Sequence, residues 1–110
     1  DVDVIELHDM VTLLEPLQLE ALGVADRGDG WRSVDDGETA LDGTLPVNPS
    51  GGLKARGHPL GATGVAQGVE LCEQLLDRAG ERQVEADVGL ACNVGGFGNC
   101  ATTVVLEGER

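Results

Sequence analysis

One histidine, His58, lies in a segment whose residue types can support proton transfer or anion binding. It stands between Gly57 and Pro59 in residues 48–64, Asn-Pro-Ser-Gly-Gly-Leu-Lys-Ala-Arg-Gly-His-Pro-Leu-Gly-Ala-Thr-Gly. Proline biases the preceding residue toward extended backbone, and glycine allows another backbone to approach closely. A predicted helix after this run directs its positive N-terminal dipole at the histidine. Such an imidazole can donate to an oxyanion or accept a proton from a thiol; the alternative is a buried histidine that ties two loops together.

The charge pattern singles out the same segment. The chain has 20 Asp and Glu against 7 Lys and Arg, a formal net charge of −13, yet no acidic residue occurs between Gly43 and Val69. The simplest reason is that a negative group, or a developing negative charge, is accommodated there. The acidity argues against nucleic-acid binding. The scarcity of lysine favours adaptation to high salt, the alternative being an ordinary acidic cytosolic protein.

A second candidate, Cys92, precedes the glycine-rich sequence Asn-Val-Gly-Gly-Phe-Gly. In that sequence Gly95 and Gly96 expose backbone N–H groups and leave room for a ligand. A thiol beside an imidazole can shuttle protons near neutral pH. Two other interpretations stay open for Cys92, namely a small core residue and a disulfide partner of Cys100.

His8 is the third candidate, because it follows a predicted strand and the carboxyl ends of strands are where sites assemble in α/β layers. The neighbouring Asp9 has the alternative role of a helix cap. Cys72 and Cys100 are predicted to be packing residues. No Cys-x-x-Cys pair occurs, so we expect no metal site and no disulfide framework, and a reducing, cytoplasmic setting fits best.

The elements that position these residues follow from hydrophobic periodicity and from glycine and proline signals. The predicted order is strand, helix, long loop, helix, strand and strand, at residues 2–7, 11–22, 24–47, 62–79, 84–92 and 100–107. The last two strands are expected to form an antiparallel hairpin around a turn at 93–99. This order predicts a single α/β layer.

Several side chains have specific expected places in these elements. In the first helix, Thr12 and Glu15 have the spacing of a capping box. Trp31 is expected to anchor the long loop. The second helix is predicted to bury one stripe at helical spacing, made of Val65, Val69, Cys72 and Leu76.

The run 48–64, the later Cys-x-x-Gly-Gly-x-Gly and the pair His8-Asp9 together resemble the C-terminal domain of thiolases. The resemblance covers nearly the whole chain and is strongest to the sterol-carrier-protein-type and archaeal-type thiolases, which carry His-Asp where commoner thiolases have Asn-Glu. It implies that residues 1–110 are a thiolase C-terminal domain. The expected fold is therefore the C-terminal half of a thiolase fold, a mixed sheet layered with helices.

The resemblance also implies an activity, the transfer of acyl groups to and from coenzyme A by thiolysis or Claisen condensation of 3-ketoacyl-CoA. It assigns His58 to activating a nucleophilic cysteine and forming an oxyanion hole, Cys92 to moving the proton at the substrate α-carbon, and His8 to lining the site. Coenzyme A is expected as a substrate, with no permanently bound cofactor. The implied substrate or coenzyme A contacts are Asn48, Ser50, Gly51, Gly52, Gly57, Gly95 and Gly96.

The chain departs from the family pattern in informative places. Close relatives of the His-Asp type often carry His at the position of Cys92, and Val94 stands where the commoner Cys-x-Gly motif has its first glycine. The family's nucleophilic cysteine lies in an N-terminal half, and none of the chain's 3 cysteines has a matching context. Since the chain begins at Asp1 rather than Met, we expect a partial chain that is inactive alone and exposes an apolar face.

The expected partners are acyl-CoA, the N-terminal thiolase half, a second copy of the protein and a zinc-ribbon/OB-fold protein. No apolar run reaches the roughly 20 residues of a membrane helix, so no membrane is expected as a partner, and the acidity excludes nucleic acid. The alternative function is a non-catalytic acyl-CoA-binding or scaffold subunit of a thiolase-like complex.

Overall fold

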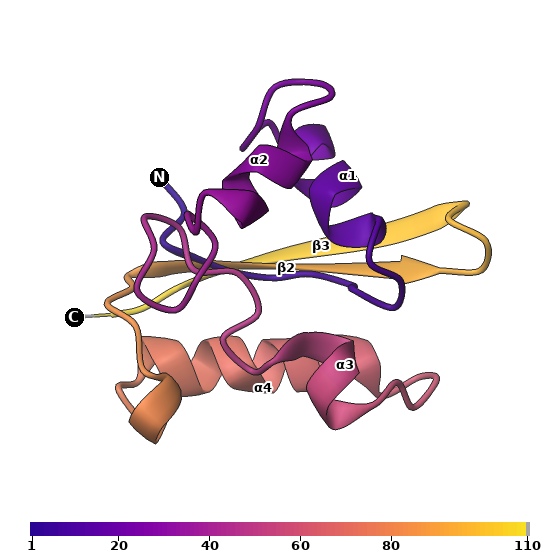
Figure 1. The fold of residues 1–110 in the computed structure, drawn as a ribbon. Coiled ribbons are helices and arrows are strands. Elements are labelled where there is room, and N and C mark those ends of the chain that lie inside the picture. Colours follow the sequence, from indigo (N-terminus) through magenta and orange to yellow (C-terminus); the bar gives the residue numbers. More distant parts are fainter. Residues whose placement is uncertain (110) are drawn as a thin grey trace.

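A computed structural model describes residues 1–109 and shows one three-stranded sheet with helices on both faces (Figure 1). The strands are β1 (Val4–Glu6), β2 (Val88–Gly95) and β3 (Cys100–Glu107). The strand order is β1-β2-β3, with β1 parallel to β2 and β2 antiparallel to β3. This arrangement confirms the α/β class and the mixed sheet that the sequence predicted.

The helices form a layer on each side of the sheet. Helices α1 (Leu14–Ala21) and α2 (Gly30–Asp35) lie on one side, and α3 (Gly52–Arg56) and α4 (Thr63–Leu75) lie on the other (Figure 1). A short 3₁₀ helix, η1 (Gly80–Arg82), leads from α4 toward β2. Because β1 and β2 are parallel, the chain must return to the same end of the sheet through a crossover connection, and the helices belong to that connection.

Alternate residues of a strand point to opposite faces, and the two faces carry separate clusters. The face toward α1 is packed by Ile5, Leu7, Leu19, Val47 and Cys92. The face toward α4 is packed by Val4, Leu71, Leu75, Val84, Ala86 and Ala91. Because β1 and β2 are in parallel register, Glu6 and its β2 neighbour Ala91 belong to the second face.

The predicted orientation of α4 is wrong. The side chains of Val65 and Val69 are 68% and 55% exposed, Leu76 after the helix is 56% exposed, and Cys72 is exposed as well. Helix α4 instead buries Leu71 and Leu75 together with the polar residues Thr63, Gln67, Glu70 and Gln74. Gln67 bonds to the Glu6 and Cys92 carbonyls and Gln74 to the Arg82 carbonyl and the Val84 N–H, and periodicity alone does not reveal such partners.

Two short helices lie where the sequence indicated only loops. Helix α2 interrupts the predicted loop 24–47, and α3 lies inside the run 48–64. The start of α2 is held by a tertiary contact, because the Gly30 N–H donates to the Glu20 carboxylate of α1 at 3.1 Å. Such short helices depend on contacts of this kind more than on their own propensity.

Smaller expectations also fail. Helix α1 begins at Leu14, after a turn in which the Leu14 N–H donates to the Val11 carbonyl, so no capping box forms at Thr12 and Glu15. Trp31 is not a buried anchor of the loop: it is 52% exposed, and the Arg32 guanidinium lies 5.0 Å from its ring centre.

The hairpin also differs from its prediction. Strand β2 continues to Gly95, which leaves a turn at 96–99 that is shorter than the predicted 93–99. Cys100 was expected to pack inside, but it is exposed at the start of β3. Both Cys92 and Cys100 are free thiols, so the disulfide alternative is wrong.

Candidate functional site

The end of β1 and the glycine-rich run hold one another through polar contacts. The Leu7 N–H donates to Asn48 Oδ1 at 2.6 Å, and the Asn48 N–H donates to the Ile5 carbonyl at 2.7 Å. Asn48 adopts a left-handed backbone (φ 52°), a conformation that Asn tolerates better than most residues. This turn starts the run alongside β1.

Two carboxylates of the same stretch hold the residues that follow. The Glu6 carboxylate accepts the Ser50 N–H at 3.1 Å and the Ser50 hydroxyl at 2.8 Å. Asp9 Oδ1 accepts the Leu53 N–H at 2.7 Å, so Asp9 satisfies a donor in the first turn of α3 and not in α1. Gly52 is required here, because a Cβ at this position would collide with the Asp9 carboxyl group.

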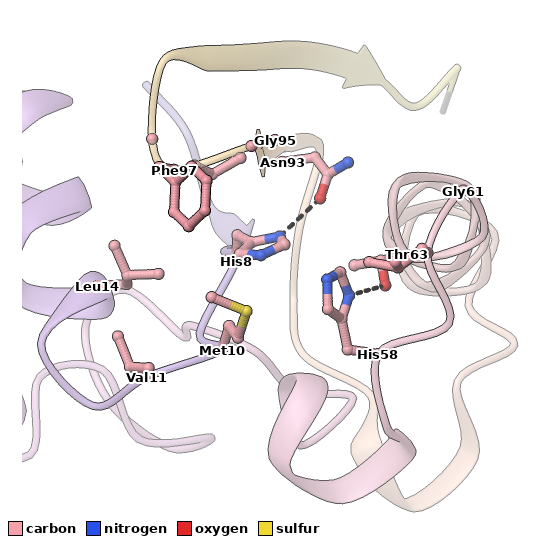
Figure 2. Close-up of a pocket in the computed structure, with 14 residues that line it drawn as sticks. His8, Met10, Val11, Leu14, His58, Gly61, Thr63, Asn93, Gly95 and Phe97 are labelled. Atoms are coloured by element: carbon pink, nitrogen blue, oxygen red, sulfur yellow. Dashed lines mark hydrogen bonds between the residues drawn. The ribbon is translucent and has the colours of Figure 1, made fainter.

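His8 and His58 meet at this junction (Figure 2). Their ring centres are 4.8 Å apart and the rings stand nearly perpendicular, at 88°. His8 is almost fully buried, and Gln18 of α1 fixes its backbone by accepting the His8 N–H at 3.2 Å and donating to the His8 carbonyl at 2.9 Å. The sequence predicted both histidines as site residues, and the structure brings them together.

Each imidazole is oriented through its Nδ1 atom, as Figure 2 shows. His8 Nδ1 lies 2.7 Å from Asn93 Oδ1, and His58 Nδ1 lies 2.6 Å from Thr63 Oγ1. An amide oxygen only accepts, so His8 Nδ1 is the donor and the Nε2 of its neutral ring carries a lone pair. The Thr63 hydroxyl donates to the Pro59 carbonyl at 3.4 Å, which leaves it able to accept from His58 Nδ1–H. His8 is thus held in the tautomer whose Nε2 can act as a base, and the bond from Thr63 to Pro59 favours the same tautomer for His58.

A pocket of about 460 Å³ opens over the two rings. Its polar floor contains His8, His58, Thr63 and Asn93. Its walls are apolar side chains and glycine backbone, from Met10, Val11, Leu14, Leu60, Gly61, Val94, Gly95, Gly96, Phe97 and Gly98 (Figure 2). An apolar pocket with a few convergent polar groups is the usual form of a small-molecule site.

Cys92 lies on the other face of the sheet. It is 6% exposed in the apolar cluster with Ile5 and Leu7, and it is not among the residues that line the pocket. Because a strand alternates its side chains, the next residue, Asn93, takes the place beside His8. Sequence reasoning missed Asn93. Alternation along β2 could have identified it, because Asn93 lies two residues after Ala91 and therefore on the face that carries Glu6 and His8.

The seven predicted contacts for substrate or coenzyme A fall into two groups. Asn48, Ser50, Gly51 and Gly52 are used in the internal junction with β1 and the start of α3. Gly95 and Gly96 line the pocket, whereas Gly57 is exposed beside it with a left-handed φ of 83°. Of the seven, Gly95 and Gly96 are the two that line the pocket.

Glu6 is a buried carboxyl group that the sequence analysis did not select. It is 0% exposed, and burial raises its pKa from 4.5 to about 7. The Ser50 hydrogen bonds and the more distant Arg56 guanidinium, 3.9 Å away, act in the opposite direction on this pKa. Alternation along β1 could have identified Glu6 as a neighbour of the site, because Val4, Glu6 and His8 share one face.

Two kinds of feature are not found in residues 1–109. No group of three or more His, Cys, Asp or Glu side chains in this range is arranged to hold a metal ion. No helix in the same range combines the length and the apolar composition needed to cross a bilayer.

The fold and the site define a class, an α/β domain with a histidine pair where β1 ends and α4 begins. Residues 1–108 match the family described as "Thiolase C-terminal domain-like". The chain therefore belongs to the thiolase C-terminal domain family, as the motifs predicted.

Individual relatives are consistent with this family. The acetyl-CoA acetyltransferase of Methanothermobacter thermautotrophicus is 53% identical over 108 residues, which are 97% of this chain and 28% of that protein. Sterol carrier protein 2 of Rattus norvegicus is 50% identical over 109 residues, 98% of this chain and 20% of that protein. A solved structure, "Ltp2-ChsH2(DUF35) aldolase", has a TM-score of 0.82 and 25% sequence identity, covering 100% of this chain and 28% of that one. The chain thus spans less than a third of the proteins that it matches.

Proposed function

We propose that this chain is the C-terminal part of a thiolase-type acyltransferase, which transfers acyl groups to and from coenzyme A by thiolysis or Claisen condensation of 3-ketoacyl-CoA. The observation that carries the proposal is the pair of imidazoles, each fixed through Nδ1, under a pocket with apolar walls. Such a pair can supply a base and, once protonated, a donor to an oxyanion. Membership of the thiolase C-terminal domain family supports the same reaction.

In this proposal His58 Nε2 accepts the proton of a nucleophilic cysteine thiol from the N-terminal half. The thiolate attacks the 3-keto carbon, and the developing oxyanion takes hydrogen bonds from the imidazolium and from backbone N–H groups of the hairpin. The bond between the α- and β-carbons then breaks, which leaves an acyl-cysteine and an acetyl-CoA carbanion that must receive a proton. A second coenzyme A thiol attacks the acyl-cysteine and restores the thiol.

Two residues of this chain are candidates for the group that protonates the α-carbon, Cys92 and His8. The family resemblance gives this role to Cys92, whose thiol must leave the apolar cluster with Ile5 and Leu7 to reach the pocket. His8 already lies in the pocket, and Asn93 fixes its ring so that Nε2 carries a lone pair. In the Claisen direction this Nε2 removes the α-proton; in thiolysis it first receives the proton that His58 took from the thiol and then gives it to the carbanion. We therefore propose His8 as the proton carrier in place of Cys92.

The N-terminal half is proposed as a partner on two grounds. The relatives are several times longer than this chain, which covers 28% of one acetyl-CoA acetyltransferase. We define the outer stripe of α4 as Val65, Val69, Cys72 and Leu76. These side chains are exposed and apolar, as expected of a surface that docks against another domain. The expected second copy, the zinc-ribbon/OB-fold partner and the cytoplasmic, high-salt setting belong to the same proposal.

The test is thiolysis of acetoacetyl-CoA by the assembled protein at high salt. His58→Ala is expected to lower kcat by about 10²–10⁴-fold, the usual contribution of a general base. Leu41→Ala, on an exposed loop away from the pocket, is the matched control and should retain the wild-type rate. If the assembled protein shows no thiolysis, or if His58→Ala is as active as the control, the proposal is wrong.

The buried position of Cys92 favours a second candidate, a non-catalytic acyl-CoA-binding or scaffold subunit. A subunit of this kind should bind acetoacetyl-CoA at equilibrium without turnover. Any rate contributed by a partner should then be unchanged by Cys92→Ser. Turnover that depends on His58 would exclude this candidate.

A further inference from the structure

Within residues 1–109, Glu6 is the one carboxylate with no exposed surface. It lies on the same face of β1 as His8, two residues earlier, and is covered by residues 48–58, which we call the 48–58 segment. His58 is the last residue of this segment. A buried charge or proton at Glu6 therefore lies directly beneath the backbone that carries one of the two site histidines.

Glu6 contacts the 48–58 segment near both ends of α3. Its carboxylate accepts the Ser50 N–H and hydroxyl before the helix, at 3.1 and 2.8 Å. It faces Arg56, the last residue of α3, with 3.9 Å between Glu6 Oε2 and Arg56 Nη2. The Arg56 Nε and Nη2 atoms are buried and make no hydrogen bond, so Glu6 supplies their nearby charge.

From these contacts we propose that Glu6 is a positioning residue that sets the place of His58 through Ser50 and Arg56. The inference rests on the proposed function, because it concerns the histidine assigned there as the base. Glu6 itself does not line the pocket and touches no reacting atom. Its effect on the site passes through the backbone of the 48–58 segment.

The charged and titratable groups around Glu6 determine how its positioning of His58 depends on pH. On the sheet it has the uncharged Ala91 beside it and His8 beyond, and the 48–58 segment contributes Arg56 and, farther along, His58. Helix α4 contributes the neutral Gln67, which donates to the Glu6 backbone carbonyl at 3.4 Å. It also contributes Glu70, which is paired with Arg82 of η1 at 3.0 Å.

Burial, the largest influence, raises the Glu6 pKa to about 7, against the Ser50 hydrogen bonds. A proton on Glu6 thus stabilises the 48–58 segment in the position that the structure shows, which we call closed. In an open position water reaches the carboxyl group, and its pKa falls toward 4.5. Raising the pH through 7 therefore shifts the segment toward opening. Linkage between these two pKa values sets an upper limit of about tenfold more opening at pH 8 than at pH 6.

Hydrogen exchange in the assembled protein measures this shift without any turnover. Deuterium uptake by a peptide spanning residues 48–58, corrected for the intrinsic pH dependence of exchange, is compared at pH 6 and pH 8. In the wild type we expect uptake to rise severalfold, up to about tenfold. In Glu6→Gln, which cannot ionise, the corrected uptake should be independent of pH. The control is Glu20→Gln, which removes a partly buried carboxylate that accepts the Gly30 N–H and has no part in the Glu6 pKa shift, so it should keep the wild-type rise.

A second variant covers the case in which Glu6→Gln does not fold. Ser50→Ala removes the hydroxyl bond that lowers the Glu6 pKa, but keeps the N–H bond, so it should raise uptake at pH 6 and increase the ratio between the two pH values. The proposal is overturned by a flat wild-type profile, by the same rise in Glu6→Gln, or by no change in Ser50→Ala. Because exchange does not depend on acyl transfer, an inactive protein would contradict the proposed function and leave this test intact. In an active protein, Glu6→Gln should move the alkaline limb of the kcat profile and leave KM unchanged.

Discussion

The two faces of the sheet are packed by different kinds of side chain. Toward α1 the buried cluster is apolar along its whole length, from Ile5 to Cys92. Toward α4 an apolar cluster around Val4 and Leu71 gives way, near the pocket, to buried polar groups such as Glu6 and Gln67. The site histidines belong to this second face. The comparison indicates that the face toward α1 mainly supplies packing, apart from Gln18, which holds the His8 backbone, while the face toward α4 carries the buried polar groups next to the site.

The apolar face is the one where a single truncation should cost most. Leu19 of α1 is 0% exposed at the centre of its cluster, so Leu19→Ala removes buried methyl groups and leaves a cavity. The expected loss is about 2–5 kcal/mol, measured as a fall in the unfolding midpoint of the assembled protein. Leu17→Ala, on the same helix but 46% exposed, is the control, and an equal loss in the two variants would contradict the cluster's importance.

The polar face should be sensitive to the loss of one side chain's hydrogen bonds. Gln74 of α4 is fully buried; it accepts the Val84 N–H at 2.9 Å and donates to the Arg82 carbonyl at 2.8 Å. Gln74→Leu keeps the volume but leaves these two backbone groups unpaired.

The expected loss for Gln74→Leu is about 1–3 kcal/mol, observed by the same unfolding measurement. Hydrogen exchange should also show the region of Val84 opening first. Glu73→Gln, at the preceding position, should stay near the wild type. An unchanged midpoint for Gln74→Leu would show that the polar face adds nothing to stability.

The outer stripe of α4 should have the smallest effect on folding and a distinct effect on assembly. Val69 is 55% exposed, so Val69→Asp is expected to change stability by no more than about 0.5 kcal/mol. In the assembled protein the same charge should weaken docking of the N-terminal half, because it would be buried in an apolar contact. Gel filtration of the reconstituted halves measures this effect, with Val24→Asp as control. Unchanged assembly would exclude α4 as the docking face.

The strands and the histidine pair were predictable because their signals are local. Alternation over residues 2–7 placed β1, and the Gly-His-Pro sequence marked His58 without reference to any distant residue. The family also followed from short motifs in a fixed order. These features depend on backbone periods and turn chemistry that a single sequence carries in full.

The remaining features depend on contacts between distant residues. The face of α4 was misassigned because Gln67 and Gln74 look exposed until their partners on β2 and η1 are known. Cys92 was favoured for its chemistry, whereas alternation along β2 turns it into the core and turns Asn93 toward His8. In both cases the apparent polarity or reactivity of a residue was a poor guide to the face that it occupies.

The hydrogen bond between His8 and Asn93 joins residues separated by 85 positions. During synthesis the glycine-rich run and His58 leave the ribosome well before Asn93, so the second imidazole has no orienting partner until β2 is made. Pairing over such a separation forms slowly, because loop closure must precede the contacts that reward it. A chain halted before residue 93 would thus carry both histidines and still lack an oriented pair, which ties completion of the site to completion of the sheet.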